Sequence, residues 1–185
     1  MKRLALVIAA MSLFTVGTAA QTFEVVPAPT CINNKGEQVI FTDRSGGGRA
    51  DVAAGVAWRN KDGKPEVVRS NFQATTADFQ KFISLHECGH HQTGDVDIPH
   101  PPRNGPEHLY NEALSDCIAI LRLRDEEAYD TDGLTRVTAA MRSDMARFGF
   151  PEISISSRIS NIENCFKREG TARDLIDARL KQRGL

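Results

Sequence analysis

Aromatic residues are scarce in this chain of 185 residues, in which phenylalanine, tyrosine and tryptophan together make up 6%. Proteins that bind single-stranded nucleic acid combine such rings, which stack on bases, with a basic groove that follows the backbone. This chain carries a formal net charge of −1 and has no stripe of lysine and arginine along it. These two shortages exclude nucleic acid as an expected partner.

Long apolar runs are also missing after residue 20, and a membrane-spanning helix needs about 20 consecutive apolar residues. Internal repeats and low-complexity tracts are absent as well. A chain of this length is enough for one compact core and hardly enough for two. The sequence therefore predicts a single domain over residues 21–185, without a membrane span.

The first twenty residues differ from the rest. Lys2 and Arg3 precede a short apolar run, Leu4 to Val16, and small residues follow at positions 18–20. This order is typical of a secretory signal peptide that is cleaved after Ala20. An uncleaved N-terminal anchor is the alternative. We expect an exported protein that is periplasmic or extracellular.

Cysteine is rare too, and all four cysteines follow the expected signal peptide: Cys31, Cys88, Cys117 and Cys165. An even number of cysteines in an exported chain favours two disulfides. Free, buried thiols are the alternative. Four cysteines allow three pairings, and the spacing alone does not select one.

The remaining sequence predicts strands first and helices afterwards. Strands are expected over 36–43, 52–60 and 65–71, and a turn at 61–64 joins the last two as a hairpin. Flexible or irregular segments are expected at the glycine-rich link 45–51 and the proline-rich loop 95–106. Helices are expected over 76–93, 107–127, 134–149, 156–168 and 171–182. This order predicts an α+β fold with a short N-terminal β-sheet.

The sequence HECGHH at residues 86–91 carries the first chemical signal. His86 and His90 are four residues apart, so on a helix they share a face and can direct their rings at one point. A tetrahedral zinc ion needs this arrangement from two of its ligands. Glu87 lies about 100° around the helix from His86, where it could contact a water on the metal rather than the metal itself. His91 lies about 100° from His90 and is not expected to be a ligand.

A third ligand is available in the sequence NEALSD at residues 111–116. Glu112 and Asp116 are also four residues apart and share one face of the second long helix. The carboxylate of Glu112 could complete a site of two histidines and one glutamate, which leaves a fourth position for water, as catalytic zinc requires. Asp116 could hold the other ring nitrogen of a ligand histidine and so fix its orientation.

The pair of motifs, HExxH followed by NExxSD, resembles the thermolysin-like metallopeptidases known as gluzincins. The resemblance covers roughly residues 76–124. It implies a small zincin-like domain in which His86, His90 and Glu112 bind Zn²⁺, Glu87 is the general base and Asp116 supports a ligand histidine. A peptide or protein would be the substrate. The chain is much shorter than thermolysin and lacks its large second domain, so it resembles a minimal exported bacterial member.

Two other functions stay open at this point. A non-catalytic zinc domain could bind a protein partner, although a structural zinc site has no need for a base such as Glu87. A zinc hydrolase could instead act on an amide that is not a peptide. The sequence assigns no residue to stabilise the oxyanion, and four residues are candidates by type alone: His100, His108, Tyr110 and Tyr129.

Two further patterns are less specific. Asp95 and Asp97 hint at calcium, but an Asp-x-Asp pair in a loop is usually just solvated. The strand residues around Val56 and Val67 could supply a sheet edge for an extended substrate. It is an equal alternative that these residues belong to the sheet and bind no substrate.

Helix geometry also suggests a disulfide pairing. Cys88 lies about 160° from the side of the first helix that carries His86 and His90, and Cys117 lies about 100° from the metal-facing side of the second. If a metal holds these two helices together, a Cys88–Cys117 bridge could join them beside the site. Cys31 and Cys165 would then tie the two ends of the domain.

Overall fold

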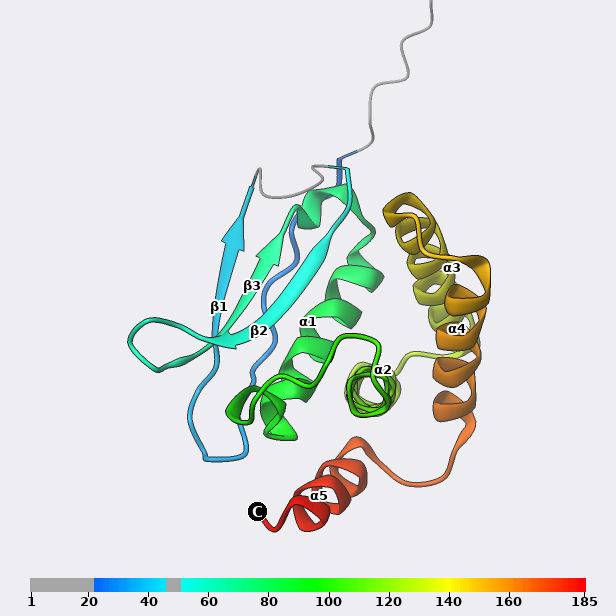
Figure 1. The fold of residues 1–185 in the computed structure, drawn as a ribbon. Coiled ribbons are helices and arrows are strands. Elements are labelled where there is room, and N and C mark those ends of the chain that lie inside the picture. The colour runs from blue at the N-terminus through cyan, green and yellow to red at the C-terminus, as the bar shows by residue number, and fades with distance from the viewer. Residues whose placement is uncertain (1–21, 46–50) are drawn as a thin grey trace, which may run out of the picture.

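The computed structural model describes residues 22–45 and 51–185. The expected signal peptide and most of the glycine-rich link lie outside these ranges. The described chain has a three-stranded sheet followed mainly by five α-helices, so the predicted α+β class is confirmed. In Figure 1 the sheet lies on the left, α1 lies beside it, α3 and α4 lie together on the right, and α5 lies below α2.

The sheet consists of β1 (Ile40–Arg44), β2 (Ala54–Arg59) and β3 (Pro65–Ser70), with β3 in the centre. β2 and β3 are antiparallel and form the predicted hairpin, while β1 runs parallel to β3. Val67 lies in the central strand, which has no free edge, so the suggestion that it supplies one is wrong. Val56 lies in β2, which is an edge strand with one unpaired side.

Five α-helices follow the sheet: α1 (Ala77–Gln92), α2 (Pro106–Glu126), α3 (Thr131–Phe148), α4 (Glu152–Lys167) and α5 (Ala172–Arg183). Short 3₁₀ turns, η1 (Phe72–Ala74) and η2 (Asp95–Asp97), flank α1. The side chain of Thr76 caps the start of α1. α3 and α4 begin earlier than expected, because Asp130 and Pro151 occupy their N-cap positions. Among the described helices, none is long and apolar enough to cross a membrane.

The main hydrophobic core lies between α1, α2, α3 and α4, where α1 packs on α2 and α3, and α4 packs on the same two helices. Its largest buried side chains include Phe82, Ile120, Met141 and Ile162. Burial of each side chain of this size contributes about 1.5–3 kcal/mol. α5 packs separately against α2 through a small cluster of buried residues, which we call the α2–α5 cluster: Leu114, Ile118, Leu121, Ala172 and Ile176.

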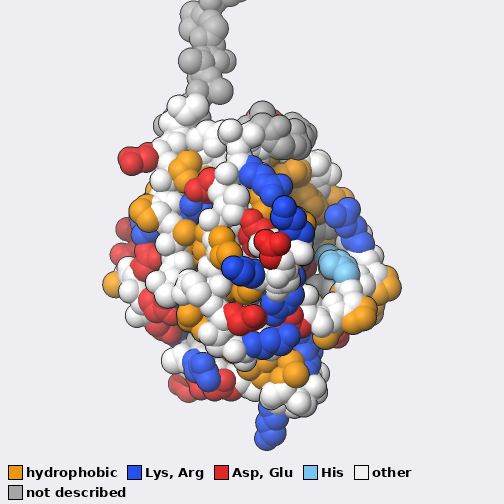
Figure 2. All heavy atoms as spheres, turned by 90° about the vertical axis from the view of Figure 1, so that its left-hand side faces the viewer, with side chains coloured by type: hydrophobic (Ala, Val, Ile, Leu, Met, Phe, Trp, Pro, Cys, Tyr) orange, Lys and Arg blue, Asp and Glu red, His pale blue; other side chains and the backbone are white. Residues whose placement is uncertain are grey.

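The outer face of the sheet is mixed in character. Acidic and basic side chains are interspersed over the side of the molecule that Figure 2 shows. Ile40, Val56 and Trp58 are exposed apolar residues on the strands. Single exposed apolar side chains are normal on a protein surface.

All four cysteines form disulfides, as predicted, but the predicted pairing is wrong. The bonds join Cys31 to Cys88 and Cys117 to Cys165. Cys88 packs in the cluster with Cys31, Val39 and Val67, whereas Cys117 and Cys165 lie in the main core, where α2 packs on α4. Two disulfides fit an oxidising, exported environment.

Candidate metal centre

Two helices bring the predicted ligands together. His86 and His90 lie one turn apart on α1, and Glu112 lies on α2. The helices approach closely because Gly89, which has no side chain, faces Ser115; a Cβ atom there would lie 3.4 Å from the Ser115 Cα atom. His86, His90 and Glu112 form the only group of three potential ligands within the described ranges.

The distances between the three ligand atoms fit one metal ion. His86 Nε2 and His90 Nε2 lie 3.2 Å apart. The carboxylate of Glu112 lies 3.6 Å from His86 Nε2 through one oxygen and 3.5 Å from His90 Nε2 through the other. A tetrahedral zinc ion with bonds of about 2.0–2.1 Å separates its ligands by about 3.3–3.4 Å. The donor set therefore fits a zinc-sized ion, and imidazole with carboxylate suits several divalent metals.

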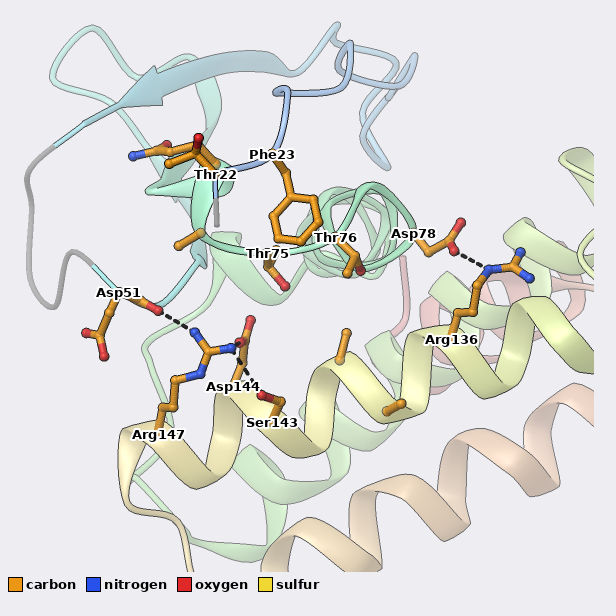
Figure 3. A pocket seen from close by; sticks show the side chains of 14 residues that line it. Thr22, Phe23, Asp51, Thr75, Thr76, Asp78, Arg136, Ser143, Asp144 and Arg147 are labelled. Atoms are coloured by element: carbon orange, nitrogen blue, oxygen red, sulfur yellow. Dashed lines mark hydrogen bonds and ion pairs between the residues drawn. The ribbon is translucent and has the colours of Figure 1, made fainter. Parts of the chain in front are cut away.

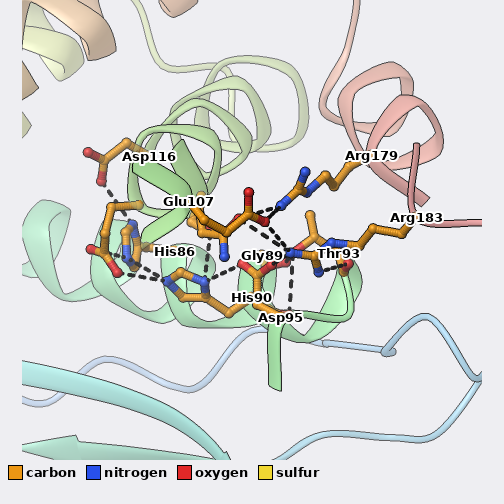
Figure 4. A network of polar contacts seen from close by, with 12 residues as sticks. His86, Gly89, His90, Thr93, Asp95, Glu107, Asp116, Arg179 and Arg183 are labelled. Atoms are coloured by element: carbon orange, nitrogen blue, oxygen red, sulfur yellow. Dashed lines mark hydrogen bonds and ion pairs between the residues drawn. The ribbon is translucent and has the colours of Figure 1, made fainter. Parts of the chain in front are cut away.

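Each histidine is held by a carboxylate on its other ring nitrogen (Figure 4). Asp116 Oδ1 lies 2.9 Å from His86 Nδ1, which is the contact that the sequence predicts. Asp95 Oδ2 accepts a hydrogen bond of 2.8 Å from His90 Nδ1. These partners leave the Nε2 atom of both rings for a metal, as they do in metal sites generally.

Each of these carboxylates is paired in turn with an arginine from the C-terminal half of the chain. Arg158 of α4 donates to both oxygens of Asp116, at 2.9 and 2.6 Å. Arg183 of α5 lies 2.5 Å from Asp95 Oδ1. The site therefore contains two parallel relays, each from histidine to aspartate to arginine. A relay of this kind balances charge in a buried region, where an unpaired carboxylate would be costly.

Electrostatic contacts shift the pKa values of these groups strongly. Burial alone would lower the pKa of His86, but Asp116 and Glu112 raise it to about 9. Burial would also lower the pKa of His90, but hydrogen bonds with Asp95 and Glu112 raise it to about 10. The Glu112 pKa is pushed well below its usual range, because the two histidines outweigh the effect of burial. In the absence of a metal, the surrounding carboxylates therefore favour the protonated forms of His86 and His90.

In the absence of a metal ion at this site, stability should depend on pH. The histidine pKa values of about 9 and 10 lie above the unfolded value of 6.5. Their stabilising contribution is therefore complete below pH 6.5 and is lost as pH rises through 9 and 10. We expect the melting temperature of chelator-treated protein to fall between pH 7 and pH 9. The metal-loaded protein serves as the control, since its ligand nitrogens carry no proton. A flat profile for the metal-free protein would contradict the assignment.

Glu87 lies next to this group and packs against the sheet. It is largely buried, and its neighbour is Gly55 of edge strand β2. A Cβ atom on Gly55 would lie 2.5 Å from Glu87 Cγ and 2.7 Å from Ile83 Cγ2, which is closer than atoms can approach. Only glycine therefore lets the β2 backbone come this near to the carboxylate of Glu87.

The structure corrects the roles expected for Asp95 and Asp97 and adds one residue, Arg158, that the sequence analysis does not identify. Asp95 is not a solvated loop residue, since its side chain is 9% exposed and holds His90. Asp97 forms ion pairs with Arg59 and Lys35 instead of a calcium site. Arg158 carries no sequence signal, because its partner Asp116 lies 42 residues away.

His91 lies outside the ligand group, as the helix geometry predicts. It is fully buried, and its Nε2 atom lies 3.1 Å from the backbone oxygen of Glu66 in β3. Burial also lowers the pKa of His91. The residue therefore joins α1 to the sheet.

The four oxyanion candidates contact other groups within the described part of the chain. Tyr129 donates to Asp78, and the ring of Tyr110 lies under the guanidinium of Arg179. The rings of His100 and His108 lie 5.6 Å apart at the proline-rich loop. These contacts do not include the ligand group or Glu87.

A cavity of about 650 Å³ lies elsewhere, between the N-terminal segment, the start of α1 and α3 (Figure 3). Its lining includes Thr22, Thr76, Asp78 and Asp144 but none of the predicted site residues. The cavity lacks the grouped histidines that metal chemistry would need. The candidate centre is therefore the ligand group on α1 and α2.

Comparisons with known proteins add no further assignment: no family model, curated protein or solved structure matches this chain.

Proposed function

We propose that this protein is an exported zinc peptidase of the gluzincin type. The observation that carries the proposal is the ligand group His86, His90 and Glu112, whose donor atoms lie at the separations of a tetrahedral ion. Glu112 is 31% exposed, so one side of the group is open to an incoming molecule. A purely structural site would normally close that position with a fourth protein ligand.

Glu87 is the proposed general base. A bound zinc ion would supply Lewis acidity that lowers the pKa of a water molecule and polarises a carbonyl group. Glu87 follows His86 directly on α1 and is held in place by the β2 backbone at Gly55. Its carboxylate would accept the proton of the attacking water and deliver it to the leaving nitrogen.

The free edge of β2 is the proposed binding site for an extended peptide. β2 is an edge strand, and its backbone reaches Glu87 at Gly55. A peptide that adds to this edge would bind through main-chain hydrogen bonds, and alternate side chains would set the specificity. The scissile bond would then lie beside both Glu87 and the ligand group.

Arg158 is the proposed stabiliser of negative charge on the substrate. Its Nη2 atom lies 3.8 Å from Glu112 Oε2, and 31% of its side chain is exposed. Asp116 occupies Nε and Nη2, which fixes the guanidinium while the remaining N–H groups stay available as donors. A fixed donor beside the reacting carbonyl is the arrangement that favours oxyanion formation.

Metal analysis combined with a peptide library tests this proposal. Protein expressed from the full sequence should carry about one zinc per chain and cleave peptides, and a chelator should abolish cleavage until zinc is restored. His86→Ala should lose the metal, whereas His100→Ala, which changes a loop histidine outside the site, should keep both metal and activity. Zinc binding without cleavage of any peptide would favour the non-catalytic zinc domain. Failure to bind any metal would refute both functions.

A further inference from the structure

The last helix of the chain reaches the metal centre through one side chain. Arg183, at the end of α5, lies 2.5 Å from Asp95 Oδ1. The other oxygen of Asp95 accepts the hydrogen bond from His90 Nδ1. A single carboxylate therefore connects α5 to a proposed metal ligand (Figure 4).

The same arginine also contacts the end of α1. Arg183 Nη1 donates to the backbone oxygen of Thr93 at 2.7 Å, and its Nη2 atom lies 3.3 Å from Asn111 Oδ1 on α2. Three segments thus meet at one guanidinium: α1, α2 and the turn that carries Asp95. Arginine can fix several partners at once because its five donors are held in a rigid plane.

Burial makes this ion pair more than a surface contact. The side chains of Asp95 and Arg183 are only 9% and 11% exposed. Exposed ion pairs contribute little, because water screens them. A buried carboxylate, by contrast, is held strongly by its cation, and losing that cation leaves an uncompensated charge. The position of Arg183 should therefore govern how Asp95 presents its other oxygen to His90.

Arg179, one turn earlier on α5, provides a comparison. It is buried, pairs with Glu107, donates to Asn111 Oδ1 at 2.7 Å and lies over the ring of Tyr110. It docks α5 on α2 next to the α2–α5 cluster. Arg183 shares the partners Glu107 and Asn111 with Arg179, but of the two arginines only Arg183 pairs with Asp95. A comparison of the two variants therefore separates contact with Asp95 from docking of the helix.

We infer that Arg183 is a positioning residue, through which α5 orients Asp95 and thereby the metal-binding nitrogen of His90. This inference rests on the proposed function, since it assumes that His90 binds a metal. It extends that function by making the C-terminal helix part of the metal centre. The relay from Arg183 runs to His90, and the relay from Arg158 runs to His86.

Measuring metal affinity shows whether Arg183 positions Asp95 and His90 or only holds α5 against α2. In the full-length protein, Arg183→Gln should weaken zinc binding about tenfold in a chelator competition, as changes behind a ligand histidine do. It should also alter the visible absorption spectrum of the Co²⁺-substituted protein. Arg183→Lys, which keeps the charge, should restore much of the affinity. Arg179→Gln should lower the melting temperature with unchanged zinc affinity, and Arg173→Gln, at a side chain 78% exposed, should change neither.

The outcomes separate this inference from the proposed function. If the wild type binds no metal, the proposed function fails and the inference falls with it. If the wild type binds zinc and Arg183→Gln binds it equally tightly, the inference alone is overturned. An equal loss in Arg179→Gln would also overturn it, because docking would then explain the effect. If Arg183→Gln does not fold, Asp95→Asn decides: unchanged zinc affinity overturns the inference, and a tenfold loss supports it.

Discussion

Replacing Glu87 with glutamine should leave the metal centre intact and reduce peptide hydrolysis by about 10²–10⁴-fold. Glutamine has nearly the same shape, so it should fit against Gly55 and keep the packing of α1 on β2. An amide cannot accept a proton from water, and loss of a general base costs about this factor. The measurement is kcat/KM on a peptide that the wild type cleaves, together with zinc content.

The control for Glu87→Gln is Glu126→Gln at the end of α2, where the carboxylate pairs with Arg122 outside the site. That variant should keep wild-type rates. Hydrolysis at the wild-type rate in Glu87→Gln would show that another group is the base. Loss of zinc in Glu87→Gln would show instead that Glu87 helps to hold the metal.

Short-range patterns account for most of what the sequence predicts correctly. The hairpin of β2 and β3 and the course of α1 follow from turn residues, capping and periodicity within single segments. The ligand group depends on two spacings of four residues, one in α1 and one in α2. Because an α-helix fixes which residues share a face, those spacings predict three-dimensional neighbours without knowledge of the whole fold.

Contacts between distant segments are what the sequence does not reveal. Arg158 and Arg183 reach the site from α4 and α5, and their positions depend on how these helices pack against α2. Asp95 follows the end of α1, and its role depends on the turn at η2, which brings the carboxylate back to His90. No local periodicity marks such residues, since each acts through a partner on another element.

For the disulfides, the sequence correctly predicts on which side of α1 Cys88 lies, but the bond predicted from it, Cys88–Cys117, is wrong. Cys88 does lie on the side of α1 opposite the metal ligands. On that side Cys88 packs with Val39 and Val67 and bonds to Cys31. Cys117 faces α4 instead, where Cys165 lies. The position of Cys88 on its own helix therefore does not determine its partner, which depends on the segments that pack against that side of α1.

Removing the bond between Cys31 and Cys88 should lower the free energy of unfolding by about 4 kcal/mol. The bond closes a loop with a sequence separation of 57 residues, and the chain-entropy model gives about this value for such a loop. It also links the segment before β1 to α1 at Cys88, which lies between His86 and His90 in the sequence. Denaturant unfolding of Cys31→Ala/Cys88→Ala, compared with the oxidised wild type in the absence of metal, measures the effect. Alanine is preferable to serine, because both cysteines are buried and alanine places no polar hydroxyl in the protein interior.

The second disulfide supplies the comparison for this measurement. The Cys117–Cys165 bond has a sequence separation of 48 residues, so the same model predicts a loss of about 4 kcal/mol for Cys117→Ala/Cys165→Ala. The two effects should therefore be similar in size, although the bonds lie in different hydrophobic clusters. A loss below about 1 kcal/mol for the Cys31–Cys88 pair would mean that packing of Val39, Val67 and α1 alone orders the N-terminal segment. The tether would then add little constraint to the unfolded chain.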